Sequence, residues 1–144
     1  MAKIRKQKIV TPDPGEFSII GIASNEKPFS VCWEINKLLD TGLTLGEPVT
    51  RLRKELNDYP SFMAFRAEDD NGNRLFLIEN VTANGYFAEK WTMFRYLLIA
   101  EGQKPAETAK HIMSALKPSP MIMLCSEIVL KSKQEISFIK SYLV

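Results

Sequence analysis

Two periods of apolar residues alternate along the chain, and the clearest example runs from Phe17 to Gly42. Residues 17–23 are apolar at both odd and even positions, as expected for a strand that is covered on both faces. Residues 28–40 instead repeat apolar side chains at the three- and four-residue spacing of a helix. The helical stripe consists of Val31, Cys32, Ile35, Leu38 and Leu39.

The ends of this helix also carry signals. Pro28 suits the first turn, where a backbone N–H has no helical partner. We expect Ser24 or Asn25 to cap the first turn with a side-chain oxygen. We expect Gly42 to end the helix in the left-handed conformation.

A β-hairpin is predicted over residues 61–68 and 74–81. Asn71-Gly72 lies between these two apolar runs, and Asn-Gly is the strongest short-range hairpin signal. The neighbouring Asp69 and Asp70 have turn chemistry and lack the glutamate of a calcium loop.

The rest of the pattern is read in the same way. It predicts a loop over 41–48, and residues 49–56 are either a strand or a helical turn. A strand is predicted over 93–100, and a helix from Pro105 to Leu116 has a stripe of Ala109, Ile112, Met113 and Leu116. Residues 121–130 are predicted to form a strand or a strand pair, and a short terminal helix follows over 134–143. The stretch 86–92 has no clear period.

This order predicts an α+β fold: a mixed or antiparallel sheet with two main helices on one face. A split βαβ, ferredoxin-like arrangement satisfies it. We expect residues 1–15 to form a basic flexible tail and residues 16–144 to form a single α+β domain.

Charge argues against a nucleic-acid-binding domain. The chain has a net charge of +2, but Lys3, Arg5, Lys6 and Lys8 lie in the tail. Outside the first eight residues the chain holds 15 basic against 17 acidic residues, so it offers no basic face. We expect no signal peptide and no membrane span, because no apolar run is long enough.

Residues that bind metals or form disulfides are few. Cys32 and Cys125 are far apart and lie in apolar surroundings, so we expect buried thiols, no disulfide and a cytoplasmic protein. His111 is the single histidine, and its helix position faces away from the apolar stripe. We therefore expect neither a metal site nor a cofactor.

No catalytic motif is recognisable either. The sequence lacks Gly-x-Ser-x-Gly, a Walker A loop and Gly-x-Gly-x-x-Gly. We therefore expect no catalytic residues, although an enzyme built from dispersed residues remains an alternative, with Glu34, Asn36, Glu89 and Arg95 as candidates.

Two groups of residues are candidates for binding. Phe29, Trp33 and Asn36 line a strip beside the apolar stripe, which borders either a pocket or a partner surface. The alternative is that Trp33 covers the sheet edge and Asn36 satisfies a backbone group.

The second group contains Trp91 and Arg95, within an aromatic cluster that interleaves with basic residues. Such a pattern can stack RNA bases. We favour core packing or self-association instead, with Phe94 and Tyr96 on one strand face and Arg95 on the other. The cluster consists of Tyr86, Phe87, Trp91, Phe94 and Tyr96.

Parts of the chain resemble a bacterial family known by its signature Ile-Pro-Glu-x-x-x-Val-Asp-Tyr. The resemblance rests on residues 17–24 (FSIIGIAS), 32–39 (CWEINKLL), 94–102 (FRYLLIAEG) and 130–135 (LKSKQE). Phe87-Ala-Glu89 and Phe94-Arg-Tyr96 stand for the two halves of the signature, so its proline and aspartate are replaced and one extra residue separates the halves. The family implies no known biochemical activity.

We therefore expect an uncharacterised, non-enzymatic binding domain that acts through self-association or a protein partner. The alternative is a regulatory module that binds a small ligand at a dimer interface.

Overall fold

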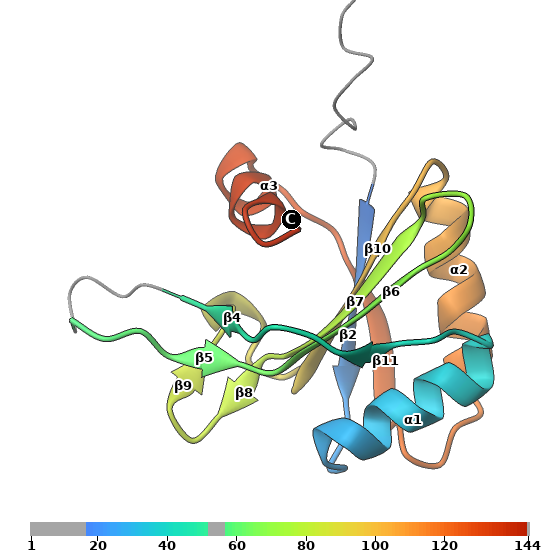
Figure 1. The fold of residues 1–144 in the computed structure, drawn as a ribbon, viewed down its shortest axis with the longest axis horizontal. Helices are drawn as coiled ribbons and strands as arrows, with labels where there is room; N and C mark the ends of the chain where they lie inside the picture. Colours follow the sequence, from blue (N-terminus) through green and yellow to red (C-terminus); the bar gives the residue numbers. More distant parts are fainter. Residues whose placement is uncertain (1–16, 52–56, 144) are drawn as a thin grey trace, which may run out of the picture.

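A six-stranded antiparallel sheet forms the centre of the molecule (Figure 1). The structure is a computed structural model and describes residues 17–51 and 57–143. Its elements are β2 (Phe17–Ala23), α1 (Pro28–Leu39), β3 (Thr44–Leu45), β4 (Val49–Thr50), β5 (Ser61–Phe62), β6 (Ala64–Glu68), β7 (Arg74–Glu79), β8 (Val81–Thr82), β9 (Gly85–Tyr86), the 3₁₀ turn η3 (Glu89–Trp91), β10 (Tyr96–Glu101), α2 (Pro105–Leu116), β11 (Leu124–Ile128) and α3 (Lys133–Lys140).

The strands lie in the order β11-β2-β10-β7-β6-β3, and each neighbouring pair is antiparallel. β10 and β11 are joined by α2 and are separated in the sheet by β2, which is a split βαβ unit. The α+β fold predicted from the sequence is therefore confirmed.

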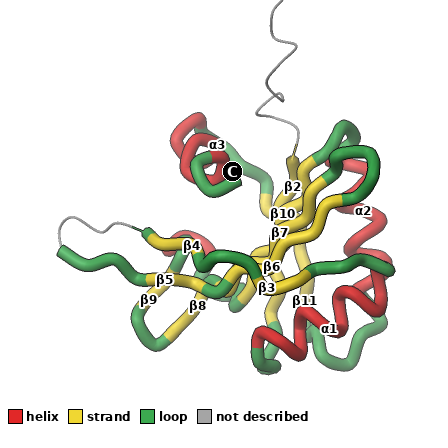
Figure 2. The backbone as a smooth tube through the Cα atoms, viewed as in Figure 1, coloured by secondary structure: helices red, strands yellow, loops and turns green. Residues whose placement is uncertain are grey.

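Helices cover the two faces of the sheet unequally (Figure 2). α1 and α2 pack together on one face, as predicted, over a core that includes Ile20, Leu77 and Leu98. α3 lies on the opposite face together with β4 and β5. Both faces of β2 are thus buried, which explains its apolar residues at both parities.

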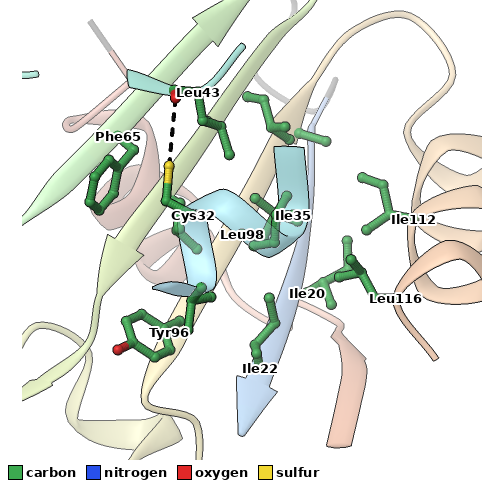
Figure 3. Packing of buried hydrophobic residues seen from close by; sticks show 14 of the residues in the cluster. Ile20, Ile22, Cys32, Ile35, Leu43, Phe65, Tyr96, Leu98, Ile112 and Leu116 are labelled. Atoms are coloured by element: carbon green, nitrogen blue, oxygen red, sulfur yellow. Dashed lines mark hydrogen bonds between the residues drawn. The ribbon is translucent and has the colours of Figure 1, made fainter. Parts of the chain in front are cut away.

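The close view in Figure 3 shows the core beneath α1. Cys32 is buried there, and its Sγ donates to the carbonyl oxygen of Leu43 at 3.5 Å. Burial raises the pKa of this thiol and of the Cys125 thiol. Both cysteines are free, and Cys125 is only partly buried.

The two predicted ends of α1 need correction. Pro28 does begin the helix, but Lys27 is its N-cap residue and makes no side-chain cap. Ser24 is bound elsewhere, because its Oγ donates to the carbonyl oxygen of Met121. At the other end, Asp40 adopts the left-handed conformation (φ 55°) that Gly42 was expected to supply. Aspartate tolerates this region better than most residues.

The predicted hairpin is confirmed as β6 and β7. Asp69 holds its loop by accepting hydrogen bonds from the backbone N–H groups of Asn71 and Asn73 and from the Asn73 side chain, each at 2.9 Å. Gly72 has a φ of 83°, which glycine adopts at little cost.

Other predicted boundaries shift by a few residues. The segment 41–48 contains the two-residue strand β3, the strand over 93–100 begins at Tyr96, and the strand over 121–130 narrows to β11. Of the ambiguous segment 49–56, residues 49–50 form β4 and residues 52–56 lie outside the described residues, as does the basic tail. No helix in the described part of the chain could span a membrane.

Candidate functional site

The predicted aromatic residues of α1 lie on its outer surface. Phe29 is 58% exposed and Trp33 is 59% exposed. The Phe29 ring meets the Phe65 ring edge-on, with centroids 5.4 Å apart, and the Lys37 ammonium lies 4.6 Å from the centre of the Trp33 ring. These two side chains form an exposed aromatic surface, and neither lines the main pocket described below.

Asn36 has a structural role. Its Nδ2 donates to the carbonyl oxygen of Leu43 at 2.9 Å, and its Oδ1 accepts from the Leu43 N–H at 2.8 Å and from the Thr41 hydroxyl at 2.9 Å. The side-chain amide therefore fastens α1 to the segment that leads into β3, and its hydrogen-bonding groups are occupied.

Trp91 and Arg95 belong to the segment that leads into β10 rather than to α1. Trp91 is partly buried and packs against the core on the α3 face of the sheet. Arg95 donates to the carbonyl oxygen of Asn25 at 3.2 Å, and its guanidinium lies 5.5 Å from the centre of the Tyr96 ring. None of the five predicted binding residues lines the main pocket described below.

Phe94 and Tyr96 are both buried, but they do not share a face as predicted. Tyr96 belongs to the core beneath α1 and α2, whereas Phe94 packs on the α3 face. The reason is that Phe94 precedes β10 and lies outside its alternation. Its ring lies against Gly21, where an added Cβ would be 2.4 Å from the ring.

Asn80 organises this region, and the sequence analysis missed it. The residue is fully buried. Its Nδ2 donates to the carbonyl oxygens of Trp91 (3.0 Å) and Phe94 (2.9 Å), and its Oδ1 accepts from the Ala88 N–H at 2.6 Å. Its backbone also bonds to Arg95 and Phe87. The signal available in the sequence was the polar pair Glu79-Asn80, which follows the apolar residues of β7.

The segment that resembles the family signature is therefore a loop anchored on one asparagine. Phe87 and Ala88 are buried, and Glu89 pairs with Arg51 at 2.9 Å. Arg51 also donates to the carbonyl oxygen of Phe87 at 2.8 Å. These contacts give the segment a structural role in this chain.

Glu34 is buried on α1 and also has structural contacts. Its Oε2 accepts from the Ser119 hydroxyl at 2.5 Å, and its Oε1 lies 3.0 Å from the Lys37 ammonium. The Ser119 hydrogen bond is the main cause of a lowered Glu34 pKa, and burial opposes it. Glu34 thus ties α1 to the turn that follows α2.

A pocket of about 490 Å³ opens where α1 ends, between that end, α2 and the tip of the β6–β7 hairpin. Its apolar lining comes from both helices and from the sheet that they cover. Two of the sheet positions are alanines, so short side chains leave room there. The apolar lining consists of Leu39, Ala67, Leu75, Ala100 and Ile112.

The polar lining of this pocket is mainly acidic. It includes four carboxylates, one arginine and His111, which is exposed as predicted. Arg74 pairs with Glu101 at 2.5 Å and also donates to the carbonyl oxygen of Leu143 at 2.8 Å. Asp69 holds the hairpin turn, and the hydrogen bond from the Asn73 side chain is the main cause of its lowered pKa. The four carboxylates belong to Asp40, Glu68, Asp69 and Glu101.

Asp40 and Glu68 are the two lining carboxylates that are exposed and make no side-chain hydrogen bond or ion pair within the described residues. Of the two, Asp40 lies on the helix side of the pocket, as the residue that ends α1. The pocket thus combines an apolar interior, an excess of negative charge and free carboxylates at its rim. In the described part of the chain, no three His, Cys, Asp or Glu side chains are grouped to hold a metal ion.

Comparisons of the chain with models of known protein families and with curated proteins give no match.

Proposed function

We propose that this protein is a non-enzymatic binding domain that holds a small organic cation in the pocket between α1 and α2. The observation that carries the proposal is the free carboxylate of Asp40 at the rim of a pocket of about 490 Å³ with an apolar interior. Pockets of roughly 300–1,000 Å³ with apolar walls and a few polar groups are typical of small-molecule sites.

Charge sets the chemical class of the ligand. The four lining carboxylates outnumber the single arginine, and that arginine is already paired with Glu101. An ammonium or guanidinium group gains a partner at Asp40, whereas an anion meets a negative potential. The apolar lining favours a hydrocarbon or aromatic body on the same molecule.

We further propose that the chain is a divergent member of the family with the Ile-Pro-Glu-x-x-x-Val-Asp-Tyr signature. The support is the sequence similarity and the coherent local role of the segment 87–96, which winds around Asn80. In this interpretation the altered signature keeps its place as a structural loop.

A calorimetric titration with three matched probes tests the ligand proposal. Phenethylamine, 2-phenylethanol and 3-phenylpropionate share a phenyl body and differ in charge. We expect binding in the order amine, alcohol, carboxylate. At one hundred times its Kd, a ligand stabilises the folded protein by about 2.7 kcal/mol, or roughly 5–10 °C in melting temperature.

Two variants locate the site. Asp40→Asn keeps a residue that tolerates the left-handed backbone and removes the charge, so we expect about tenfold weaker amine binding. Ala67→Leu fills the interior and should abolish binding of all three probes. Asp70→Asn is the matched control, because Asp70 lies at the exposed hairpin tip outside the lining. Equal binding of amine and carboxylate, or no effect of Asp40→Asn, would contradict the proposal.

A further inference from the structure

The two edges of the main sheet differ in how well they are protected. The β3 edge has only two residues and is followed by Gly46 and Pro48. Short edge strands and prolines discourage the pairing of further strands. The β11 edge has five residues without glycine or proline, and it pairs only with β2 among the described residues.

Exposed apolar side chains lie at the two ends of the β11 edge, with Met123 just before the strand and Val129 just after it. Met123 is 64% exposed, Leu124 is 53% exposed and Val129 is 69% exposed. Glu127 is the single charged residue of the strand. A regular edge strand that carries apolar side chains is a template for pairing with another chain.

The sequence of this edge complements itself in an antiparallel pair. When Ser126 lies opposite Ser126 of a second copy, Leu124 faces Ile128 and Met123 faces Val129. Leu124, Ile128, Met123 and Val129 thus each meet an apolar residue, and the smallest side chain lies on the twofold axis. Cross-strand apolar pairs of this kind stabilise antiparallel sheets.

The same register separates the acidic residues. Glu127 lies opposite Cys125 of the second copy and not opposite its own equivalent. Parallel in-register pairing would instead place Glu127 beside Glu127, and like charges directly opposite are destabilising. The edge therefore favours one orientation, in which a twofold axis closes the assembly at two copies.

We propose that the β11 edge binds a second copy of this chain, with the twofold axis at Ser126. The two six-stranded sheets then form one continuous twelve-stranded antiparallel sheet. No β11 residue lines the pocket between α1 and α2, so this dimer goes beyond the proposed ligand function and stands apart from it.

Sedimentation velocity over a range of protein concentrations tests the dimer. We expect a monomer–dimer equilibrium whose dissociation constant rises tenfold or more in Leu124→Lys. Met93→Lys is the matched control, because Met93 is 71% exposed and lies outside the β11 edge. Thermal melts and circular dichroism of both variants establish that each is folded. A monomer at every concentration, or equal dimerisation of Leu124→Lys and the wild type, would overturn the proposal.

Disulfide trapping tests the register. Facing residues of an antiparallel pair have Cα atoms roughly 4.5–5.5 Å apart, which is within the reach of a disulfide. In a Cys125→Ser background, we expect Ser126→Cys to form a covalent dimer on mild oxidation. Asp70→Cys, at the exposed hairpin tip, should remain monomeric under the same conditions. Equal cross-linking of the two variants would overturn the Ser126-centred pairing. The probe titrations do not depend on either result, so the two proposals fail separately.

Discussion

Replacement of Asn80 by alanine is the sharpest test of how this fold is held together. The change removes three side-chain hydrogen bonds and leaves the carbonyl oxygens of Trp91 and Phe94 and the N–H of Ala88 without their partner. An unsatisfied buried group costs about 1–3 kcal/mol. Because partial relaxation admits water to some of these groups, we expect a loss of about 3–5 kcal/mol. That is a large part of the roughly 5–15 kcal/mol that stabilises a typical protein.

Urea unfolding measures this loss as a lower midpoint with an unchanged slope. Gln103→Ala is the control, because it removes an exposed amide and should change stability by less than about 0.5 kcal/mol. In a Trp33→Phe background, the fluorescence of Trp91 reports the loop directly, and we expect Asn80→Ala to shift its emission to the red. A loss below about 1 kcal/mol with unchanged emission would refute the role assigned to Asn80.

Three further predictions concern buried groups. Ser119→Ala should cost about 1.5–3 kcal/mol, the range for a hydrogen bond to a charged group. Because the folded state lowers the Glu34 pKa, the stabilisation from the Ser119–Glu34 hydrogen bond is present above pH 4.5 and is lost as the pH falls further. The free energy of unfolding, measured from pH 7 to pH 3, should therefore depend less on pH in the variant than in the wild type. Burial raises the pKa of Tyr96 to about 12, so the free energy of unfolding should fall between pH 10 and 12. Tyr96→Phe should remove this fall in stability. The same variant should lose one late transition from the ultraviolet titration of tyrosine. Gly21→Ala should cost roughly 1–3 kcal/mol in urea unfolding, because its Cβ meets the Phe94 ring, and an unchanged midpoint would contradict this packing.

The pocket and the β11 edge lie on different parts of the molecule but share one helix. The pocket is bounded by α1, α2 and the hairpin tip, whereas the β11 edge lies at one end of the sheet. α2 is common to both, because it lines the pocket and packs against β11.

Local signals in the sequence determined the main elements. Pro28 and Pro105 mark the first turns of α1 and α2, and the apolar repeat that follows each of them places its buried face. Asn71-Gly72 marks the hairpin between β6 and β7. These signals are readable because turn and helix preferences depend on residues only a few positions apart.

Only the tertiary structure decided the roles of Asn80, Glu34 and Asn36. The Asn80 side chain bonds to a carbonyl 14 residues away, and Glu34 bonds to a serine 85 residues away. Asn36 and Glu34 were candidates for function in the sequence, and their hydrogen bonds show that they fasten loops to α1.

The pocket and the open edge likewise follow from tertiary structure. The pocket is assembled from both helices and three strands, and its room comes from alanines that meet only when the sheet forms. The strand at 121–130 was predicted, but its position at an edge depends on β2 lying between β10 and β11. The sequence by itself thus determined which segments are helix, strand and turn, because those preferences are local. Contacts between distant segments decided which buried polar groups have hydrogen-bond partners and which surfaces stay exposed.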